Sequence, residues 1–126
     1  MSTFRFTEDH EWIRIDEDGE GIVGITDYAQ EQLGELVYIE LPDVGAEVSQ
    51  GDDCAVVESV KAAGDVKTPV SGTISSVNED LADNPQATNE DPAGEGWLYR
   101  IRLADDSELD SLMDESAYQA YLNSLE

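Results

Sequence analysis

The chain has 126 residues, and its 30 acidic side chains against 6 basic ones give a formal net charge of −24 at pH 7. This length suits a single core, so we expect residues 1–126 to form one domain. The acidic balance argues against nucleic acid as a partner, because binding to phosphates needs a basic surface.

Short β-type segments separated by turn residues fill the first two-thirds of the chain. Their spacing predicts a compact sandwich or barrel. Gly51-Asp52 and Ser71-Gly72 have the residue types that close hairpins, and a last strand is expected to begin near Trp97. In chain order the earlier segments are EWIRI (11–15), GIVGIT (21–26), LVYIEL (36–41), EVSQ (47–50), CAVVESV (54–60), VKTPVSG (66–72) and TISSVN (73–78).

Two segments favour helices. In DYAQEQLG, Asp27 is the expected N-terminal cap and Gly34 the expected end. At the C-terminal end, Asp114 is the expected cap of a helix whose apolar face should lie on the sheet. Between the last two strands, residues 81–96 are expected to form a long loop with two prolines and two glycines. The apolar face of the C-terminal helix consists of Ala117, Tyr118, Tyr121, Leu122 and Leu125.

Several function classes find no support in the pattern. No apolar run approaches the roughly 20 residues of a membrane-spanning helix, and the N-terminal stretch MSTFRFTEDHEW resembles no secretory signal. We therefore expect a cytoplasmic protein with no membrane partner. His10 is the only histidine and Cys54 the only cysteine, and neither has a partner at ligand spacing, so no metal site is predicted.

Both lysines of the chain lie within VVESVKAAGDVKTPVSGTI, as Lys61 and Lys67. The small residues after Lys61 predict a tight reversal between two β segments, with this lysine exposed at its tip. Exposed lysines usually serve solubility, but here carboxylates do so, and lysine is absent elsewhere. A Schiff-base nucleophile would need a desolvated pocket, which a hairpin tip lacks. An exposed tip suits covalent modification instead.

The scarcity of lysine has its own explanation. A halophilic host with molar salt in its cytoplasm would favour an acidic surface, because a Debye length of about 3 Å screens the repulsion between carboxylates and the hydrated surface keeps the protein dissolved.

A series of stretches covers nearly the whole chain in a recognisable order. They are HEW (10–12), GITDYAQEQLGELVYIELPDVG (24–45), VVESVKAAGDVKTPVSGTISSVNEDL (56–81), GWLYRI (96–101) and LMDESAYQAYL (112–122). In these stretches the chain resembles the glycine cleavage system H proteins, a family of lipoate-bearing carriers. The resemblance implies a mainly β fold of the lipoyl/biotinyl type, a flattened barrel or sandwich of two small antiparallel sheets with a short internal helix and a C-terminal helix. It also implies that Lys61 bears lipoate in amide linkage, with Glu58 and Gly72 recognised by the modifying enzyme.

The resemblance further implies a carrier and not an enzyme. Its expected partners are glycine decarboxylase with pyridoxal phosphate, an aminomethyltransferase with tetrahydrofolate, dihydrolipoyl dehydrogenase with FAD and NAD, and an enzyme that attaches the lipoate. The carrier itself is expected to be a monomer. Two alternatives stay open: an H-like protein that relays lipoate to 2-oxoacid dehydrogenases, and an unmodified acidic binding module. The mass of the native protein separates the last from the others.

An aminomethyl group carried on sulfur is labile to water and therefore needs shelter. Its cationic amine would be held by a carboxylate in a groove. The resemblance places Glu11, with His10 beside it, and Asp65 in this role. Asp9 stands where relatives often have serine or threonine. Lys67 stands where many relatives have tyrosine or another polar residue, and we expect it to be a surface residue near the arm.

Overall fold

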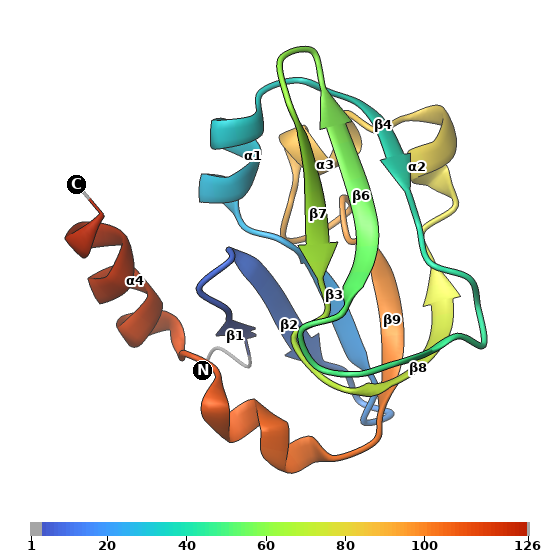
Figure 1. The fold of residues 1–126 in the computed structure, drawn as a ribbon, viewed down its shortest axis with the longest axis vertical. Coiled ribbons are helices and arrows are strands. Elements are labelled where there is room, and N and C mark those ends of the chain that lie inside the picture. The colour runs from blue at the N-terminus through green and yellow to red at the C-terminus, as the bar shows by residue number, and fades with distance from the viewer. Residues whose placement is uncertain (1–3, 126) are drawn as a thin grey trace.

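The computed structural model describes residues 4–125, which form two antiparallel sheets with short helices at their margins (Figure 1). The mainly β prediction is confirmed. The larger sheet has the strand order β1 (Phe4–Phe6), β2 (Glu11–Ile15), β3 (Gly21–Ile25), β9 (Tyr99–Leu103), β8 (Gly72–Val77) and β5 (Glu47–Val48). The smaller sheet has the order β4 (Leu36–Glu40), β6 (Asp53–Ser59) and β7 (Ala63–Lys67).

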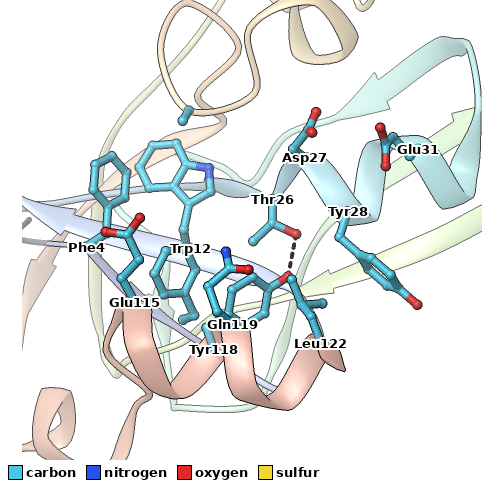
Figure 2. A pocket seen from close by; sticks show the side chains of 12 residues that line it. Phe4, Trp12, Thr26, Asp27, Tyr28, Glu31, Glu115, Tyr118, Gln119 and Leu122 are labelled. Atoms are coloured by element: carbon cyan, nitrogen blue, oxygen red, sulfur yellow. Dashed lines mark hydrogen bonds between the residues drawn. The ribbon is translucent and has the colours of Figure 1, made fainter. Parts of the chain in front are cut away.

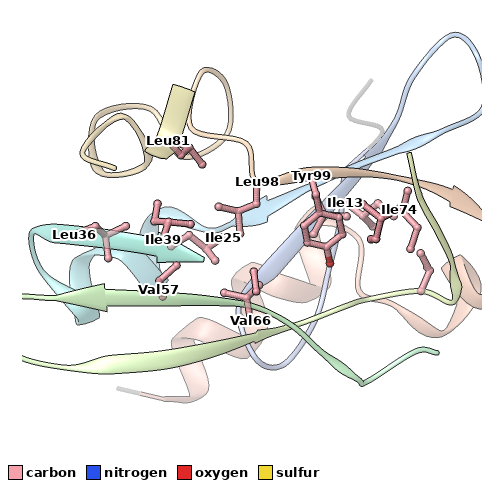
Figure 3. Packing of buried hydrophobic residues seen from close by; sticks show 14 residues of the cluster. Ile13, Ile25, Leu36, Ile39, Val57, Val66, Ile74, Leu81, Leu98 and Tyr99 are labelled. Atoms are coloured by element: carbon pink, nitrogen blue, oxygen red, sulfur yellow. The ribbon is translucent and has the colours of Figure 1, made fainter. Parts of the chain in front are cut away.

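The core lies between the two sheets, as Figure 3 shows. Side chains alternate along each strand, so one face of each strand supplies the apolar residues that fill this space. Burial of these groups is the main stabilising contribution, at roughly 25 cal/mol for each Å² of apolar surface removed from water. The larger sheet contributes Ile13, Val23, Ile74, Tyr99 and Ile101, and the smaller sheet contributes Leu36, Ile39, Val57 and Val66.

The first helix, α1 (Asp27–Leu33), begins one residue away from the predicted cap. Thr26 caps it, because its extended backbone lets its hydroxyl oxygen accept from the Ala29 backbone N–H at 3.2 Å. The prediction of Asp27 as the cap was therefore wrong, and Asp27 instead occupies the first turn, where a negative charge is favourable. The predicted end at Gly34 is confirmed, with φ of 86° and a backbone N–H that donates to Gln30.

Residues 81–96 do not form the predicted loop. Two single-turn helices, α2 (Asp80–Asp83) and α3 (Ala87–Glu90), organise this segment. Helices this short show no periodicity in sequence and depend on tertiary contacts for their stability. Asn89 supplies such a contact, since its side-chain amide donates to the Gly34 carbonyl at 2.9 Å and its oxygen accepts from the Leu36 N–H at 2.8 Å.

The C-terminal helix α4 (Glu115–Ser124) follows a 3₁₀ segment, η1 (Asp106–Ser111). Asp114 caps α4 as predicted, and its carboxylate accepts from the Ala117 N–H at 2.8 Å. The predicted packing was only partly right, because α4 lies beside the edge strand β1 instead of across the sheet (Figure 1). Tyr118 is buried there, whereas Ala117 and Leu125 are exposed.

Neither predicted hairpin turn joins paired strands. Gly51-Asp52 leads from β5 in the larger sheet to β6 in the smaller, and Ser71-Gly72 lies where the chain enters β8 after it has left β7. Residues 68–71 are consequently outside any strand, contrary to the prediction for 66–72. Gly72 is itself the first residue of β8 and is buried, and a Cβ atom there would overlap the carbonyl oxygen of Arg102.

This crowding gives a prediction for Gly72→Ala. The added methyl group meets backbone of β9, which cannot move without breaking the pairing of β8 with β9, so the free energy of unfolding should fall by about 1–3 kcal/mol. Gly64→Ala is the matched control, because its Cβ would meet only the Leu33 side chain at an ordinary 3.7 Å. Urea unfolding followed by tryptophan fluorescence measures both. Equal midpoints for the two variants would contradict the prediction.

Candidate functional site

Lys61 lies at the tip of the β6–β7 hairpin and is exposed, as expected from the sequence (Figure 1). The side chain of Ser59 organises this turn. Its hydroxyl oxygen accepts from the backbone N–H groups of Lys61 at 3.3 Å and Ala62 at 3.0 Å, while the Ser59 N–H donates to the Ala62 carbonyl at 2.7 Å. These bonds hold the lysine backbone in place while leaving its amine in solvent.

The tip also rests against the end of α1. The Lys61 side chain passes over Gly34, where a Cβ atom, if one were added, would lie 3.1 Å from Lys61 Cε, and the Val60 N–H donates to the Glu35 carbonyl at 3.1 Å. A glycine at the helix end therefore serves two purposes, since it adopts a positive φ that disfavours other residues and leaves room for the lysine stem. This contact between two distant segments is not predictable from the local sequence.

The outward face of β7 leads away from the tip. Ala63, Asp65 and Lys67 are exposed on this face, while Val66 between them is buried in the core. Asp65 therefore lies midway along the strand. Glu58 is exposed on β6 and pairs with Ala63, near the tip, whereas Gly72 is buried in the other sheet.

A cavity of about 300 Å³ lies at the far end of β7, and Glu11 lines it. The side chain of Glu11, at the start of β2, is only 3% exposed. Of the described residues that line this cavity, the sequence prediction named Glu11 as a pocket residue and Lys67 as a surface residue near the arm. His10 and Asp65, also predicted for the pocket, are not among the lining residues. The lining comes from residues 6–9 with Glu11, residues 50–51, residues 67–69 and residues 111–113.

Two hydrogen bonds hold the Glu11 carboxylate. The Thr7 hydroxyl donates to Oε1 at 2.7 Å, and the Lys67 backbone N–H donates to Oε2 at 3.3 Å. Burial nevertheless raises the pKa of Glu11 from 4.5 to about 7, although both hydrogen bonds act to lower it. The carboxyl is therefore poised between its two protonation states near neutral pH and responds to any charge that enters the cavity.

Thr7 is a site residue that sequence reasoning missed. Position 9 is an aspartate, and Thr7 supplies a hydroxyl to Glu11 from the other end of the β1–β2 turn. Thr7 and Glu11 face each other because the Thr7 N–H donates to the Glu11 carbonyl at 2.9 Å. Predicting the three-residue strand β1 would have revealed this pairing, but so short a strand has no readable alternation.

His10 lies next to Glu11 in sequence but faces the other way. Its backbone is left-handed, with φ of 69°, and its Nδ1 lies 2.8 Å from the Tyr118 hydroxyl. The pKa of His10 is lowered, mainly because burial disfavours the charged imidazolium, and the negative charge of Asp9 partly opposes this effect. The Tyr118 hydroxyl also lies 2.8 Å from Thr26 Oγ1, so His10 belongs to the cluster that attaches α4 to the sheet.

Beside this cluster is a second cavity of about 390 Å³, between α4 and the start of α1 (Figure 2). Figure 2 shows Trp12 and Phe4 on one side, Tyr118 on α4, and Tyr28 and Glu31 on α1. The Trp12 indole N–H donates to the carbonyls of Ile25 at 2.9 Å and Pro92 at 3.0 Å. The aromatic residues that line this cavity therefore belong to the interface between α4 and the larger sheet.

In residues 4–125, no group of three His, Cys, Asp or Glu side chains has a geometry suited to hold a metal ion. Among the same residues, no helix is both long and apolar enough to cross a membrane.

Comparison with known proteins assigns the chain to a family. The family model described as "Glycine cleavage H-protein" matches residues 4–125. The chain belongs to the glycine cleavage H-protein family. It is 52% identical to the glycine cleavage system H protein of Rhodospirillum rubrum and 55% identical to that of Parvibaculum lavamentivorans, over 126 residues and the whole length of each. The crystal structure of a glycine cleavage system H protein from Mycobacterium marinum superposes with a TM-score of 0.89 at 39% identity, covering 98% of both chains.

Family membership establishes the class of function. The chain is a lipoyl carrier of the glycine cleavage system that shuttles an aminomethyl group, and it is a carrier protein, not an enzyme. This agrees with the geometry, in which an exposed lysine and a carboxylate-lined cavity occupy opposite ends of one strand.

The buried carboxyl predicts a pH dependence of stability. Because the folded pKa of Glu11, about 7, lies above its ordinary value of 4.5, the folded state binds more protons between these pH values, and stability falls as pH rises through that window. The change from 4.5 to about 7 corresponds to roughly 3 kcal/mol. Relative to Glu11→Gln, the natural chain should therefore lose up to that amount between pH 4.5 and 8. Urea unfolding of both proteins across this range measures the difference, and parallel profiles would contradict it.

Proposed function

We propose that Lys61 is the residue that carries lipoate, joined through its ε-amine as an amide. The observation that supports this is the position of an exposed lysine at the tip of a well-ordered turn in an H-protein chain. The amine is accessible to a modifying enzyme and, after acylation, to several partners in turn. When bound, the lipoyl group supplies a dithiolane, a strained disulfide whose sulfur accepts the aminomethyl group.

The reach of such an arm matches the length of β7. From Ala63 to Lys67 the strand advances four residues, or roughly 13 Å at about 3.3 Å per residue. A lipoyl-lysine side chain contains about a dozen bonds of roughly 1.5 Å, so a zigzag arm spans on the order of 14 Å. Because Lys61 lies two residues before β7, an arm anchored there and laid along the outward face of the strand reaches Asp65 and points toward the Glu11 cavity, which Lys67 lines at the far end.

The Glu11 cavity is the proposed shelter for the loaded arm. Thr7 and the Lys67 backbone fix the carboxylate oxygens, and an arriving ammonium favours the ionised form of a group whose pKa is about 7. The cavity walls limit the access of water to the labile carbon. Asp65, on the path along β7, is proposed as a secondary contact, whereas His10 acts on the loaded arm only through its place beside Glu11 in the turn.

The partners follow from this role. Glycine decarboxylase with pyridoxal phosphate loads the arm, the tetrahydrofolate-dependent aminomethyltransferase unloads it, and dihydrolipoyl dehydrogenase with FAD and NAD reoxidises it. A lipoate-attaching enzyme recognises the β6–β7 hairpin, where the exposed Glu58 lies three residues before Lys61. The buried position of Gly72 supports an indirect contribution through the fold. We propose a monomer acting in the cytoplasm, and the halophilic origin stays a prediction.

The assignment of Lys61 is tested by mass. Lys61→Arg keeps the positive charge and removes the acylable amine, so the protein should fold, carry no lipoyl group and support no glycine decarboxylation. Lys67→Arg is the matched control, because it alters the other lysine of the chain, and it should still acquire the lipoyl mass on Lys61. Peptide mass spectrometry of protein from the native host reads both. A lipoyl group on Lys67, or on neither lysine, would overturn the assignment.

The shelter is tested by Glu11→Gln, which removes the charge and nearly preserves the shape. Lipoylation and reoxidation should be almost unchanged, but the loaded arm should leave the cavity more often. Because a hydrogen bond to a charged group contributes roughly 1.5–3 kcal/mol, formaldehyde release should accelerate about ten- to hundredfold. The protein is loaded with glycine and decarboxylase, the enzyme is removed, and formaldehyde is followed with time.

Two further variants make this test specific. Glu8→Gln removes a charge from the same cavity without touching the carboxylate that we assign to the amine, and should have a smaller effect. Asp65→Asn measures the contribution of the path along β7. Equal release from the natural chain and Glu11→Gln would show that the shelter is not at Glu11, and a large effect of Asp65→Asn alone would place it on the strand.

A further inference from the structure

Lys67 is placed in the wall of the Glu11 cavity. It is the last residue of β7, and its backbone N–H donates to Glu11 Oε2 at 3.3 Å, which fixes its backbone beside the carboxylate. Its side chain is exposed and lines the same cavity. Among the described residues lining the cavity, the charged ones are three acids and this lysine: Glu8, Asp9, Glu11 and Lys67.

We propose that the Lys67 ammonium is a competing cation that weakens the hold of the Glu11 cavity on the aminomethyl-loaded arm and so determines how readily the arm is released. This inference rests on the proposed function, in which a cationic amine is held by Glu11. It assigns to Lys67 an electrostatic role, because the lysine ammonium repels a cargo that carries the same positive charge. The sequence alone indicates only a surface residue.

The physical reason is the repulsion of like charges in a confined space. The lysine ammonium is a point charge on a flexible four-carbon stem that starts at the cavity wall, so its positive charge stays near the cavity although the side chain itself is exposed. Its charge already acts on Glu11, whose pKa it lowers beside the larger effects of burial and hydrogen bonding. A loaded arm that reaches the same carboxylate is therefore repelled by the Lys67 charge.

Such competition suits a carrier. Three carboxylates around a cavity of about 300 Å³ would hold an ammonium strongly, yet the cargo has to be handed to a second enzyme. A cation fixed to the cavity wall lowers the retention of the cargo without removing the carboxylate that orients it. Lys67 is the one basic side chain among the described residues that line the cavity, so the effect depends on a single position.

The experiment measures formaldehyde release from loaded Lys67→Gln at pH 8, where Glu11 is largely ionised. Removing one like charge close to the amine should slow release about three- to tenfold in dilute buffer. The difference should shrink in molar KCl, where charges are screened beyond about 3 Å. Lys67→Arg, which keeps the charge, should release close to the natural rate. Arg102→Gln removes the same charge from an exposed residue outside the cavity, and should leave release unchanged.

A second measurement does not require the loaded arm. In the unlipoylated protein, carbon-13 NMR titration of the Glu11 carboxyl should show a higher pKa in Lys67→Gln than in the natural chain, and no change in Arg102→Gln. Unchanged or faster release from Lys67→Gln, together with accelerated release from Glu11→Gln, would overturn this inference alone. Unchanged release from Glu11→Gln would overturn the proposed shelter and this inference with it.

Discussion

The burial of Val66 between the two sheets is the constraint on which the rest of the site depends. Because successive side chains of a strand point to opposite faces, packing Val66 inward turns Asp65 and Lys67 outward. Val57 on the neighbouring strand β6 is buried in the same core. The hairpin is thus fixed at its base by apolar packing, and its tip with Lys61 projects into solvent (Figure 1).

The β1–β2 turn brings the second half of the site to the end of that hairpin. His10 holds the turn in shape, since its N–H donates to the Thr7 carbonyl at 3.1 Å and its carbonyl accepts from the Thr26 N–H at 3.0 Å. Its ring contacts Tyr118 of α4. The C-terminal helix and Thr26, the cap of α1, therefore both contribute to the position of Glu11, although neither supplies a carboxylate to the cavity.

The buried carboxylate is a local cost to the fold with a functional explanation. In a chain with 30 acidic residues, a further acid is easily kept at the surface, yet Glu11 is almost fully buried. Burying a carboxyl disfavours its charged form, which is why its pKa rises to about 7. Functional sites commonly violate the rules that the rest of the fold obeys, and a buried carboxylate whose ionised form is further stabilised when a cation arrives suits a carrier whose cargo is cationic.

The sequence by itself determined the features that depend on local pattern. Alternation predicted most strands, the residues of 27–34 predicted α1, Asp114 predicted the start of α4, and the small residues after Lys61 predicted an exposed tip. The H-protein resemblance drew attention to Glu11. Tertiary structure alone decided the cavity, because its lining comes from four separate segments whose approach no local pattern encodes. It also separated His10 from Glu11, brought Thr7 and Lys67 to the carboxylate, and buried Gly72 against β9, since each of these depends on which strands pair and which faces pack.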